Sequence, residues 1–298
     1  MKKLIIPGEF FAFITISLWS TNALISAHIS HIAPIEISFF RWLIAFLCLL
    51  PISFKSIKGH PRALLNHWKF FLTLALCLVI ENAFFYNAGH TTDAVNISLF
   101  SASMPLFLLL FEALFMKNSL TVFQVMGIII AAISVMYAIL HGDFKRLASL
   151  SFKVGDLYAL GSVFFLSLYT FLQRRKAPSI SVKTFLFILS GCIGLLNFPA
   201  FMYHEIQTRN LFSFNLTEVY ILLYLGIGIS LISYLFWEMA TQKIGPLKTG
   251  FIHYFSIPVT ALLNFIILGI PISRFQVISC LGIILSSVLM NKKVKKVG

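Results

Sequence analysis

The sequence predicts an all-α membrane protein with ten transmembrane helices in two inverted five-helix repeats, and three observations lead to this fold class. First, 59% of the 298 residues are hydrophobic and only 11% are charged, with a mean hydropathy of +0.92. Second, long apolar runs follow one another with short connections. Third, features of the first half recur in the second. A soluble core of this size cannot bury so much apolar surface, so lipid must be the main solvent.

The predicted helices follow from the length of the apolar runs. A hydrocarbon core of about 30 Å requires about 20 apolar residues of helix. The runs are continuous rather than alternating, which excludes a β-barrel, and they end at charged residues, Pro or Gly. In the first half the runs are Phe10–Ile29, Pro34–Phe54, Trp68–Ala88, Ala94–Met116 and Thr121–Leu140. In the second half they are Val154–Leu172, Val182–Met202, Thr217–Ala240, Leu247–Leu268 and Phe275–Met290.

The N-terminal run is expected to be the first span rather than a signal peptide, because no small-x-small cleavage site follows it. The four cysteines lie in four different apolar segments with neither paired-loop nor metal-ligand spacing, so we expect no disulfide, no metal and no cofactor. They are Cys48, Cys77, Cys192 and Cys280.

The positive charge sets the expected orientation. The formal net charge is +13, but the basic residues gather at the ends of spans, where they determine topology and meet lipid headgroups, so we expect no nucleic-acid partner. A cytoplasmic N-terminus places 17 of the 23 basic residues inside, and both termini are therefore expected in the cytoplasm. The 17 are Lys2, Lys3, Lys55, Lys58, Arg62, Lys69, Lys117, Arg174, Arg175, Lys176, Lys183, Lys243, Lys248, Lys292, Lys293, Lys295 and Lys296.

The two halves share short patterns at nearly constant offsets. Gly8-Glu9-x-x-Ala12 recurs as Gly155-Asp156-x-x-Ala159, Pro105 corresponds to Pro258, and Phe123-Gln124-Val125 corresponds to Phe275-Gln276-Val277. Since each half has five spans, an odd number, the second copy must cross the membrane in the opposite direction. Inverted repeats of this kind place a solute site near the midplane of the membrane.

A polar and aromatic stripe runs along the first span and recurs in the sixth. In the first span the stripe is Phe11, Thr15, Leu18, Asn22 and Ser26. In the sixth span it is Tyr158, Ser162, Phe165, Tyr169 and Gln173. The spacing places each set on one helical face, and we expect Asn22 and Tyr169 to line a watery interior. Helix packing through small polar residues is the alternative.

The ninth span has the most continuous polar face, interrupted by Pro258. Its members are Thr249, His253, Ser256, Thr260 and Asn264. A proline frees a carbonyl and can bend the helix. The fourth span carries Asn96, Ser103 and Pro105 at equivalent places. We predict Asn96, Ser103 and His253 as binding residues, with an interhelical hydrogen bond as the alternative role of His253.

Glu81 is the one carboxylate near the middle of a span. A charge buried there must face a cavity, pair with a cation or be protonated. Asn82 and Tyr86 follow it one turn apart on one face, and Tyr86, Trp237 and Tyr254 could offer aromatic faces to a cationic substrate. Arg41 is the only basic residue well inside a span. Substrate contact competes there with snorkelling to the interface or pairing with Glu36.

These residues carry a resemblance to a known family. Leu18-Trp19-Ser20-Thr21-Asn22, Pro34 with Phe40-Arg41, Pro105 and Gln124-x-x-Gly127 together resemble the drug/metabolite transporter superfamily, in particular its EamA-type branch. The resemblance covers essentially the whole chain and implies two repeats, 1–147 and 148–298, around a central cavity. Lys117-Asn118 and Gly269-Ile270 depart from the Gly-Glu pairs that the family often has after spans four and nine.

The resulting functional prediction is a secondary transporter of the bacterial inner membrane. It would move a small polar metabolite, an amino acid or a related amine-containing compound, out of the cell by alternating access. The alternative is an importer or exchanger of a nucleotide-like or cationic metabolite such as S-adenosylmethionine. An enzyme is not expected, because no His-Glu-x-x-His, Gly-x-Ser-x-Gly or paired mid-membrane carboxylates occur. The expected partners are a small-molecule substrate and the lipid bilayer, and the choice between monomer and homodimer stays open.

The orientation can be tested by cysteine accessibility in intact cells. Cysteines replacing Lys55 and Arg175 are expected to resist an impermeant thiol reagent, whereas cysteines replacing Thr91 and Arg209 are expected to react, because basic residues are retained on the cytoplasmic side. External labelling at position 175 would contradict the inverted repeat.

Overall fold

The computed structural model describes residues 6–58, 67–92, 94–116, 121–140, 142–145, 154–175, 180–208 and 214–290. Within these residues every regular element is a helix. Seven helices are long and apolar enough to cross a membrane: Gly8–Ser26, Pro34–Ser53, Trp68–Thr91, Val154–Arg175, Val182–Thr208, Leu216–Ile244 and Pro246–Leu268. Three shorter apolar helices accompany them, namely Met104–Met116, Val122–Tyr137 and Arg274–Met290. The chain is therefore an α-helical, multi-pass membrane protein.

The helix bounds follow the apolar runs closely. The first half consists of α1 (Gly8–His28), α2 (Pro34–Lys58), α4 (Trp68–Thr91), α5 (Ala94–Ser101), α6 (Met104–Met116) and α7 (Val122–Ile139). The second half consists of α8 (Val154–Leu172), η2 (Gln173–Arg175), α9 (Val182–Thr208), α10 (Leu216–Tyr224), η3 (Leu225–Ile232), α11 (Ser233–Ile244), α12 (Pro246–Ile252), η4 (His253–Phe255), α13 (Ser256–Leu268) and α14 (Arg274–Met290).

Two of the predicted spans are broken in the middle. The fourth divides into α5 and α6 at Ala102–Ser103, and the ninth divides into α12 and α13 at the 3₁₀ turn η4. Both breaks lie just before a proline, Pro105 or Pro258. A proline ring collides with the carbonyl four residues earlier and donates no hydrogen bond, so the helix is interrupted on its N-terminal side.

The eighth predicted span contains a stretch that the sequence analysis did not anticipate. Between α10 and α11 the chain forms a π-helix, η3, over Leu225–Ile232. Gly226 and Gly228 lie within it, and a Cβ at Gly226 would stand 2.5 Å from Ile44 of α2. The wider π turn thus lies against the second helix, and π segments in proteins frequently mark functional sites.

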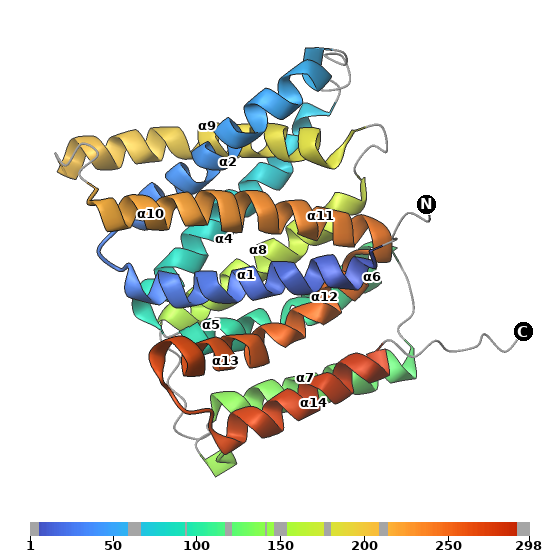
Figure 1. The fold of residues 1–298 in the computed structure, drawn as a ribbon. Helices are drawn as coiled ribbons and strands as arrows, with labels where there is room; N and C mark the ends of the chain where they lie inside the picture. Colours follow the sequence, from blue (N-terminus) through green and yellow to red (C-terminus); the bar gives the residue numbers. More distant parts are fainter. Residues whose placement is uncertain are drawn as a thin grey trace, which may run out of the picture.

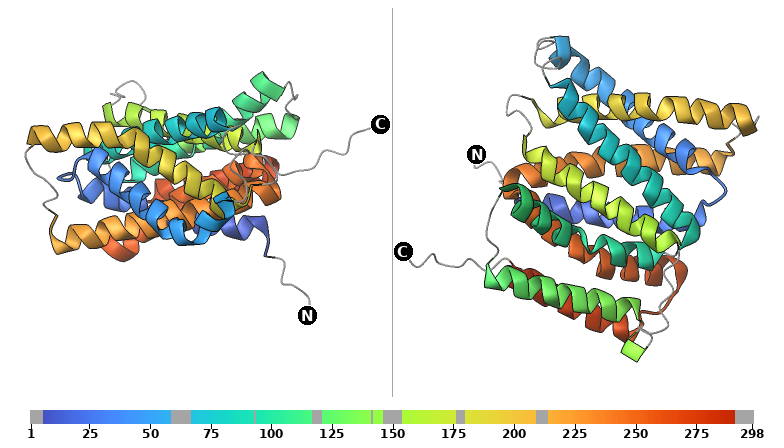
Figure 2. Two further views of the ribbon diagram at one scale, coloured as in Figure 1. Left: turned by 90° about the horizontal axis from the view of Figure 1, so that it is seen from above. Right: turned by 180° about the vertical axis from the view of Figure 1, so that it is seen from behind.

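The helices pack side by side in an elongated bundle (Figure 1). α1 begins and α14 ends at the same end of the bundle, which we call the termini end, and we call the opposite end the far end. The pair α2 and α9 lies at one edge and the pair α7 and α14 at the other, with the remaining helices between them (Figure 2). The aromatic stack of Phe39 on Phe201, with ring centroids 4.2 Å apart, joins α2 to α9.

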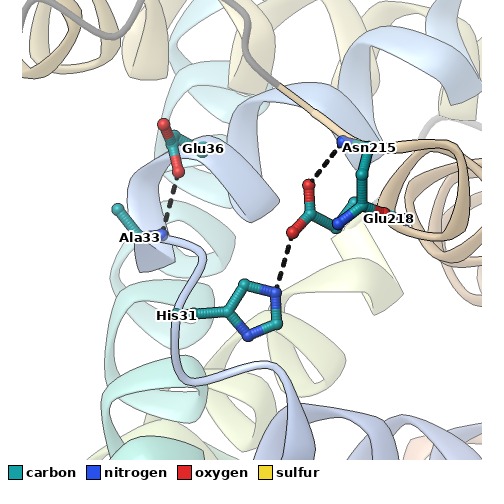
Figure 3. Close-up of polar contacts among 5 residues, drawn as sticks. All are labelled: His31, Ala33, Glu36, Asn215 and Glu218. Carbon is teal, nitrogen blue, oxygen red and sulfur yellow. Dashed lines mark hydrogen bonds and ion pairs between the residues drawn. The ribbon is translucent and has the colours of Figure 1, made fainter.

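At the far end, polar contacts join the connection between α1 and α2 to the start of α10 (Figure 3). Asn215 and Glu218 form a capping box: the Asn215 side chain accepts from the backbone N–H of Glu218, and Glu218 accepts from that of Asn215. His31 Nε2 lies 2.9 Å from Glu218 Oε1. Glu36 accepts from the backbone N–H of Ala33 and caps the first turn of α2. Asn215-Leu216-Thr217 fits the Asn-x-Thr pattern of a glycosylation site, but in this structure the Asn215 side chain caps the start of α10.

Close helix approach depends on particular glycines. A Cβ added to Gly89 of α4 would lie 2.7 Å from Ser26 Cβ and 2.9 Å from the Ser26 backbone carbon of α1. A Cβ added to Gly194 of α9 would have nothing within 4 Å. Both glycines lie inside helices, so an alanine would bring the same gain of about 1 kcal/mol in helix propensity at each.

We therefore expect Gly89→Ala and Gly194→Ala to change stability in opposite directions. Overpacking against backbone atoms costs about 1–3 kcal/mol, so Gly89→Ala should lower the melting temperature of the purified protein, while Gly194→Ala should keep or raise it. Thermal denaturation in detergent, followed by circular dichroism, measures both. Equal melting temperatures would show that α1 and α4 are not in tight contact at Gly89.

Candidate functional site

An internal cavity lies among α1, α2, α4, α5, α8, α11 and the η4–α13 segment. Its empty volume, including space that is open to solvent, is about 530 Å³. Its lining combines two charged side chains with serines, an asparagine, a histidine and aromatic rings: Trp19, Ser20, Asn22, Ala23, Arg41, Glu81, Phe85, Ile97, Ser98, Ser101, Ser162, Val163, Leu166, Tyr234, His253 and Ser256.

Arg41 projects from α2 into the bundle interior and is only 2% exposed. Its Nε donates to Ser230 Oγ at 2.7 Å. One terminal nitrogen donates to Asn82 Oδ1 at 2.8 Å and to the Tyr86 hydroxyl at 2.7 Å. The guanidinium thus neither snorkels to the interface nor turns toward Glu36, because polar groups of α4 and η3 satisfy it inside the bundle.

The arginine network extends to the first helix through Tyr86. The Tyr86 hydroxyl, which accepts from Arg41, donates to Asn22 Oδ1 at 3.1 Å. Asn82 in turn donates its amide N–H to the carbonyl of Leu78 on its own helix. Three helices and the π segment are therefore joined around one buried charge, and the three polar side chains predicted at positions 22, 82 and 86 all belong to this network.

Glu81 lines the same cavity from α4 and is 7% exposed. Ser162 of α8 donates to its Oε1 at 3.4 Å, while Oε2 has no hydrogen-bond partner among the described residues. Arg41 is close enough to interact with the Glu81 carboxylate electrostatically. A carboxylate oxygen left without a donor in a low-dielectric space gains most from an arriving N–H group or cation.

The aromatic residues form a layer on the termini-end side of the cavity. Trp19 packs on Trp237 with ring centroids 4.8 Å apart and on Tyr234 at 5.4 Å, and Tyr169 packs on Tyr234 at 6.0 Å. Edge and tilted contacts of this kind are favourable between aromatic rings. We call Trp19, Tyr169, Tyr234 and Trp237 the aromatic layer.

His253 lies in the η4 break beside this layer. Its ring centroid is 5.8 Å from that of Trp19 and 6.2 Å from that of Trp237. The side chain lines the cavity, and its Nδ1 has no hydrogen-bond partner within the described part of the chain. The break before Pro258 therefore presents a histidine nitrogen to the interior. Thr260, seven residues further along the same face, hydrogen-bonds Ser98 at 2.8 Å.

The structure divides the ten predicted site residues into groups. Asn22, Glu81 and His253 line the cavity. Asn82 and Tyr86 lie behind it as partners of Arg41. The side chain of Asn96 falls outside the described residues.

The other four predicted site residues are not among the residues that line this cavity. Tyr169 and Trp237 lie in the aromatic layer, where their polar atoms bond Glu238 and Thr170. Ser103 and Tyr254 line a second, mostly apolar cavity with Ala102, Leu106, Ile128, Ala131, Ala132, Val135 and Met136. The helix breaks at Ala102–Ser103 and at η4 shift the register of each face, so a regular helical spacing does not place these two side chains correctly.

Several lining residues were not selected from the sequence. Trp19 and Ser162 lay inside patterns noted above, but Ser98, Phe85 and Tyr234 carried no signal beyond polarity or aromaticity. Ser230, the partner of Arg41 Nε, lies in the π segment. The extra residue in each π turn changes which side chains face inward, and the unbroken apolar run around it does not reveal this.

The groups that line the cavity can recognise a small polar solute. The cavity offers one carboxylate, one guanidinium, neutral hydroxyls and aromatic faces, all on helices of the bundle. Among the described residues no group of three or more His, Cys, Asp or Glu side chains is placed to hold a metal ion. A small molecule with a positive and a negative group fits these donors and acceptors.

Comparisons with known proteins bear on the whole chain. The sequence model described as the EamA-like transporter family matches it twice, at residues 6–140 and 153–292. An uncharacterized transporter of Bacillus subtilis, YyaM, is 27% identical over 207 residues, which are 68% of this chain and 66% of that protein. An uncharacterized transporter of Clostridium kluyveri is 23% identical over 99% of this chain and 95% of its own length.

A further relative and one solved structure extend the comparison. An uncharacterized transporter of Methanothermobacter thermautotrophicus is 25% identical over 84% of this chain and 76% of its own length. A crystal structure of a protein matches the fold with a TM-score of 0.70 over 95% of this chain and 96% of the other, at 19% identity. At that identity the likeness concerns the fold alone.

The Arg41 network can be tested through Tyr86, whose hydroxyl both accepts and donates. Tyr86→Phe removes the hydroxyl and leaves the guanidinium and Asn22 each short of a partner, so the free energy of unfolding should fall by about 1–3 kcal/mol. Tyr220→Phe is the matched control, since Tyr220 is 62% exposed on α10. Melting temperatures in detergent measure both. An unchanged value for Tyr86→Phe would show that this hydroxyl does not support the buried charge.

Proposed function

The chain belongs to the EamA-like transporter family, and from this premise we propose that it exports a small amine-containing metabolite, such as an amino acid, by alternating access. It is a multi-pass membrane transporter, as the family and its relatives indicate. The observation that carries the finer proposal is the cavity, which both Glu81 and Arg41 line. An ammonium group is complementary to Glu81, and a carboxylate is complementary to Arg41.

The charges discriminate among substrate classes. Glu81 keeps a carboxylate oxygen without a donor among the described residues, so a positive group gains most there. A negative group can add to the hydrogen bonds that Arg41 already makes inside the bundle. Phe85, Trp19 and Tyr234 supply aromatic surface for the body of the solute. A zwitterion of modest size satisfies both charges at once, which favours an amino acid over a neutral sugar or a simple amine.

The architecture proposed for transport is ten spans in two inverted repeats, divided near residues 147 and 148. The double match to one family model supports it. The packing supports it too: α4 lies on α8 as α1 lies on α11, and the pairs α2–α9 and α7–α14 each join equivalent helices of the two halves. Rocking of one half against the other would then expose the cavity to each side alternately. The bacterial inner membrane, with both termini cytoplasmic, is the proposed location.

The second candidate is an importer or exchanger of a nucleotide-like or cationic metabolite, S-adenosylmethionine being an example. One observation favours it: Trp19, Phe85 and His253 around the cavity offer flat faces on which a base can stack. We place it second because stacking alone gives no role to the two opposite charges. An enzymatic function has less support still, since the family and the named relatives are transporters.

Glu81→Gln tests the proposal directly, because it keeps shape and hydrogen bonding while it removes the charge. A thermal-shift panel of amino acids, polyamines, nucleotides and S-adenosylmethionine first identifies the ligand of the wild type. The variant should then bind an amine-containing ligand about 10-fold to 100-fold more weakly, the range expected for loss of a charged hydrogen-bond partner. Glu9→Gln is the control, since Glu9 is exposed at the start of α1.

Transport in proteoliposomes separates the two roles that Glu81 can have. If substrate-for-substrate exchange survives in Glu81→Gln while net transport driven by a pH gradient is lost, Glu81 carries the coupling proton. Loss of binding assigns it to the substrate's ammonium group. A variant with the wild-type transport rate and unchanged pH dependence would refute both roles, and a nucleotide as the sole stabilising ligand would favour the second candidate.

A further inference from the structure

A second buried carboxylate lies on the termini-end side of the cavity, outside the site described above. Glu238 of α11 is 1% exposed. The Tyr169 hydroxyl of α8 donates to Glu238 Oε1 at 2.9 Å. Next to it, the indole N–H of Trp237 donates to Thr170 Oγ1 at 3.1 Å. Two side-chain hydrogen bonds therefore join α8 to α11 where the aromatic layer closes the cavity.

Glu81 and Glu238 are bonded to the same face of α8 at two different depths. Ser162 donates to Glu81, and Tyr169, seven residues later, donates to Glu238. Seven residues are about two helical turns, or about 10 Å along the axis. On α11, Tyr234 and Glu238 are four residues apart and share a face, and Tyr234 lines the cavity. The cavity with Glu81 thus lies at one depth along α8, and Glu238 lies about two helical turns closer to the termini end.

The aromatic layer separates these two levels. Trp19, Tyr169, Tyr234 and Trp237 pack on one another with ring centroids between 4.8 and 6.0 Å apart. Of these four residues, Tyr169 donates to Glu238 and Trp237 donates to Thr170. Side chains can change rotamer without displacement of a whole helix, which is a local route by which such a layer can open. The bond from Tyr169 to Glu238 holds one of its rings in place.

Glu238 is also near the aqueous side. It lies six residues before the end of α11 at Ile244, which is about 9 Å along the helix. The titratable or charged groups on its own helix and on the elements packed around it include Glu9, Tyr169, Arg174, Arg175, Lys183, Cys192, Tyr234, Lys243, Lys248 and His253. His28, Asp156, Tyr158, Tyr203, His204 and Glu205 lie on the far-end parts of these elements. Arg174 pairs with Glu112, and Lys243 donates to the Ile6 carbonyl.

We propose that Glu238 is a proton-binding site on the cytoplasmic side, and that its protonation releases Tyr169 and opens the aromatic layer inward. The inference rests on the proposed function. A charged carboxylate accepts a hydrogen bond about twice as strong as a neutral one, so the ionised form holds Tyr169 and keeps the layer closed. A proton taken up from the cytoplasm by the Glu238 carboxylate removes that charge. Proton uptake from the cytoplasm thus coincides with the step of the transport cycle in which the cavity opens to the cytoplasm.

Accessibility of the cavity tests this without knowledge of the substrate. Leu166 lines the cavity just beyond the layer. In a background where Cys48, Cys77, Cys192 and Cys280 are replaced by alanine, Leu166→Cys is labelled with an impermeant maleimide from the cytoplasmic side of inside-out vesicles. Lowering the pH on that side by about two units should raise the labelling rate about ten-fold, a change of ~1.4 kcal/mol in the opening equilibrium.

Three variants decide between a proton site and a packing contact. Glu238→Gln, which imitates the protonated form, should label fast at every pH. Tyr169→Phe keeps the ring, loses the bond and should behave in the same way, so a folding defect in one variant does not remove the test. Glu112→Gln, a carboxylate at the same end of the bundle, should keep the wild-type pH dependence. Each labelling rate is divided by the rate at which the same maleimide reacts with free cysteine at that pH, which removes the pH dependence of the reagent.

Retained pH dependence in folded Glu238→Gln or Tyr169→Phe would overturn the inference. Wild-type labelling that does not change with pH would also overturn it, and would leave the transport proposal intact. If position 166 can be labelled from one side of the membrane only under every condition, alternating access itself fails and the inference fails with it.

Discussion

The burial of one guanidinium in the middle of an apolar bundle is the constraint on which the rest of the interior depends. Arg41 cannot lose its charge, so lipid or protein carbon around it must be replaced by hydrogen-bond acceptors. Ser230, Asn82 and Tyr86 provide them. These acceptors come from two other segments of the chain, and the Tyr86 hydroxyl passes the connection on to Asn22. Four segments are thereby held at fixed distances around a polar centre, and a cavity persists beside it.

Interruptions in the helices bring polar side chains to that centre and to the cavity beside it. The π segment brings Ser230 to Arg41, and the break before Pro258 turns His253 inward. The break before Pro105 ends α5 beside the cavity, which Ile97, Ser98 and Ser101 line. Non-helical backbone at membrane depth is tolerated only where protein or a water-filled space surrounds it. Among the described residues, the segments around the breaks before Pro105 and Pro258 line the cavity, and the π segment lies behind it as a partner of Arg41. The long helices α2 and α9 lie at the edge of the bundle.

The two buried carboxylates Glu81 and Glu238 lie at different depths in the bundle and have different surroundings. Glu81 has an oxygen without a donor in the described structure and faces the cavity, which suits a ligand. Glu238 is bonded to Tyr169 and lies behind aromatic rings, which suits a group that governs access. The same helix, α8, supplies the donor at both levels. A transporter needs to bind its solute and to close one side of the site, and the two tasks would be assigned to different acidic residues on one structural axis.

The sequence by itself determined that lipid surrounds the chain, where along the chain the helices lie, and which polar residues lie within them. Hydrophobic runs long enough to span a bilayer can satisfy their backbone only as helices, and α8 coincides with its predicted run, Val154–Leu172. Asn22, Glu81 and His253, which line the cavity, were selected from the sequence because a polar group in such a run is expensive to bury without a purpose. Only the tertiary structure decided that Arg41 points inward, that Tyr254 faces a different cavity and that Glu238 meets Tyr169. Local spacing describes faces of a regular helix, whereas breaks and a π turn change those faces, and partners 69 or 189 residues apart in the chain are chosen by the packing of whole helices.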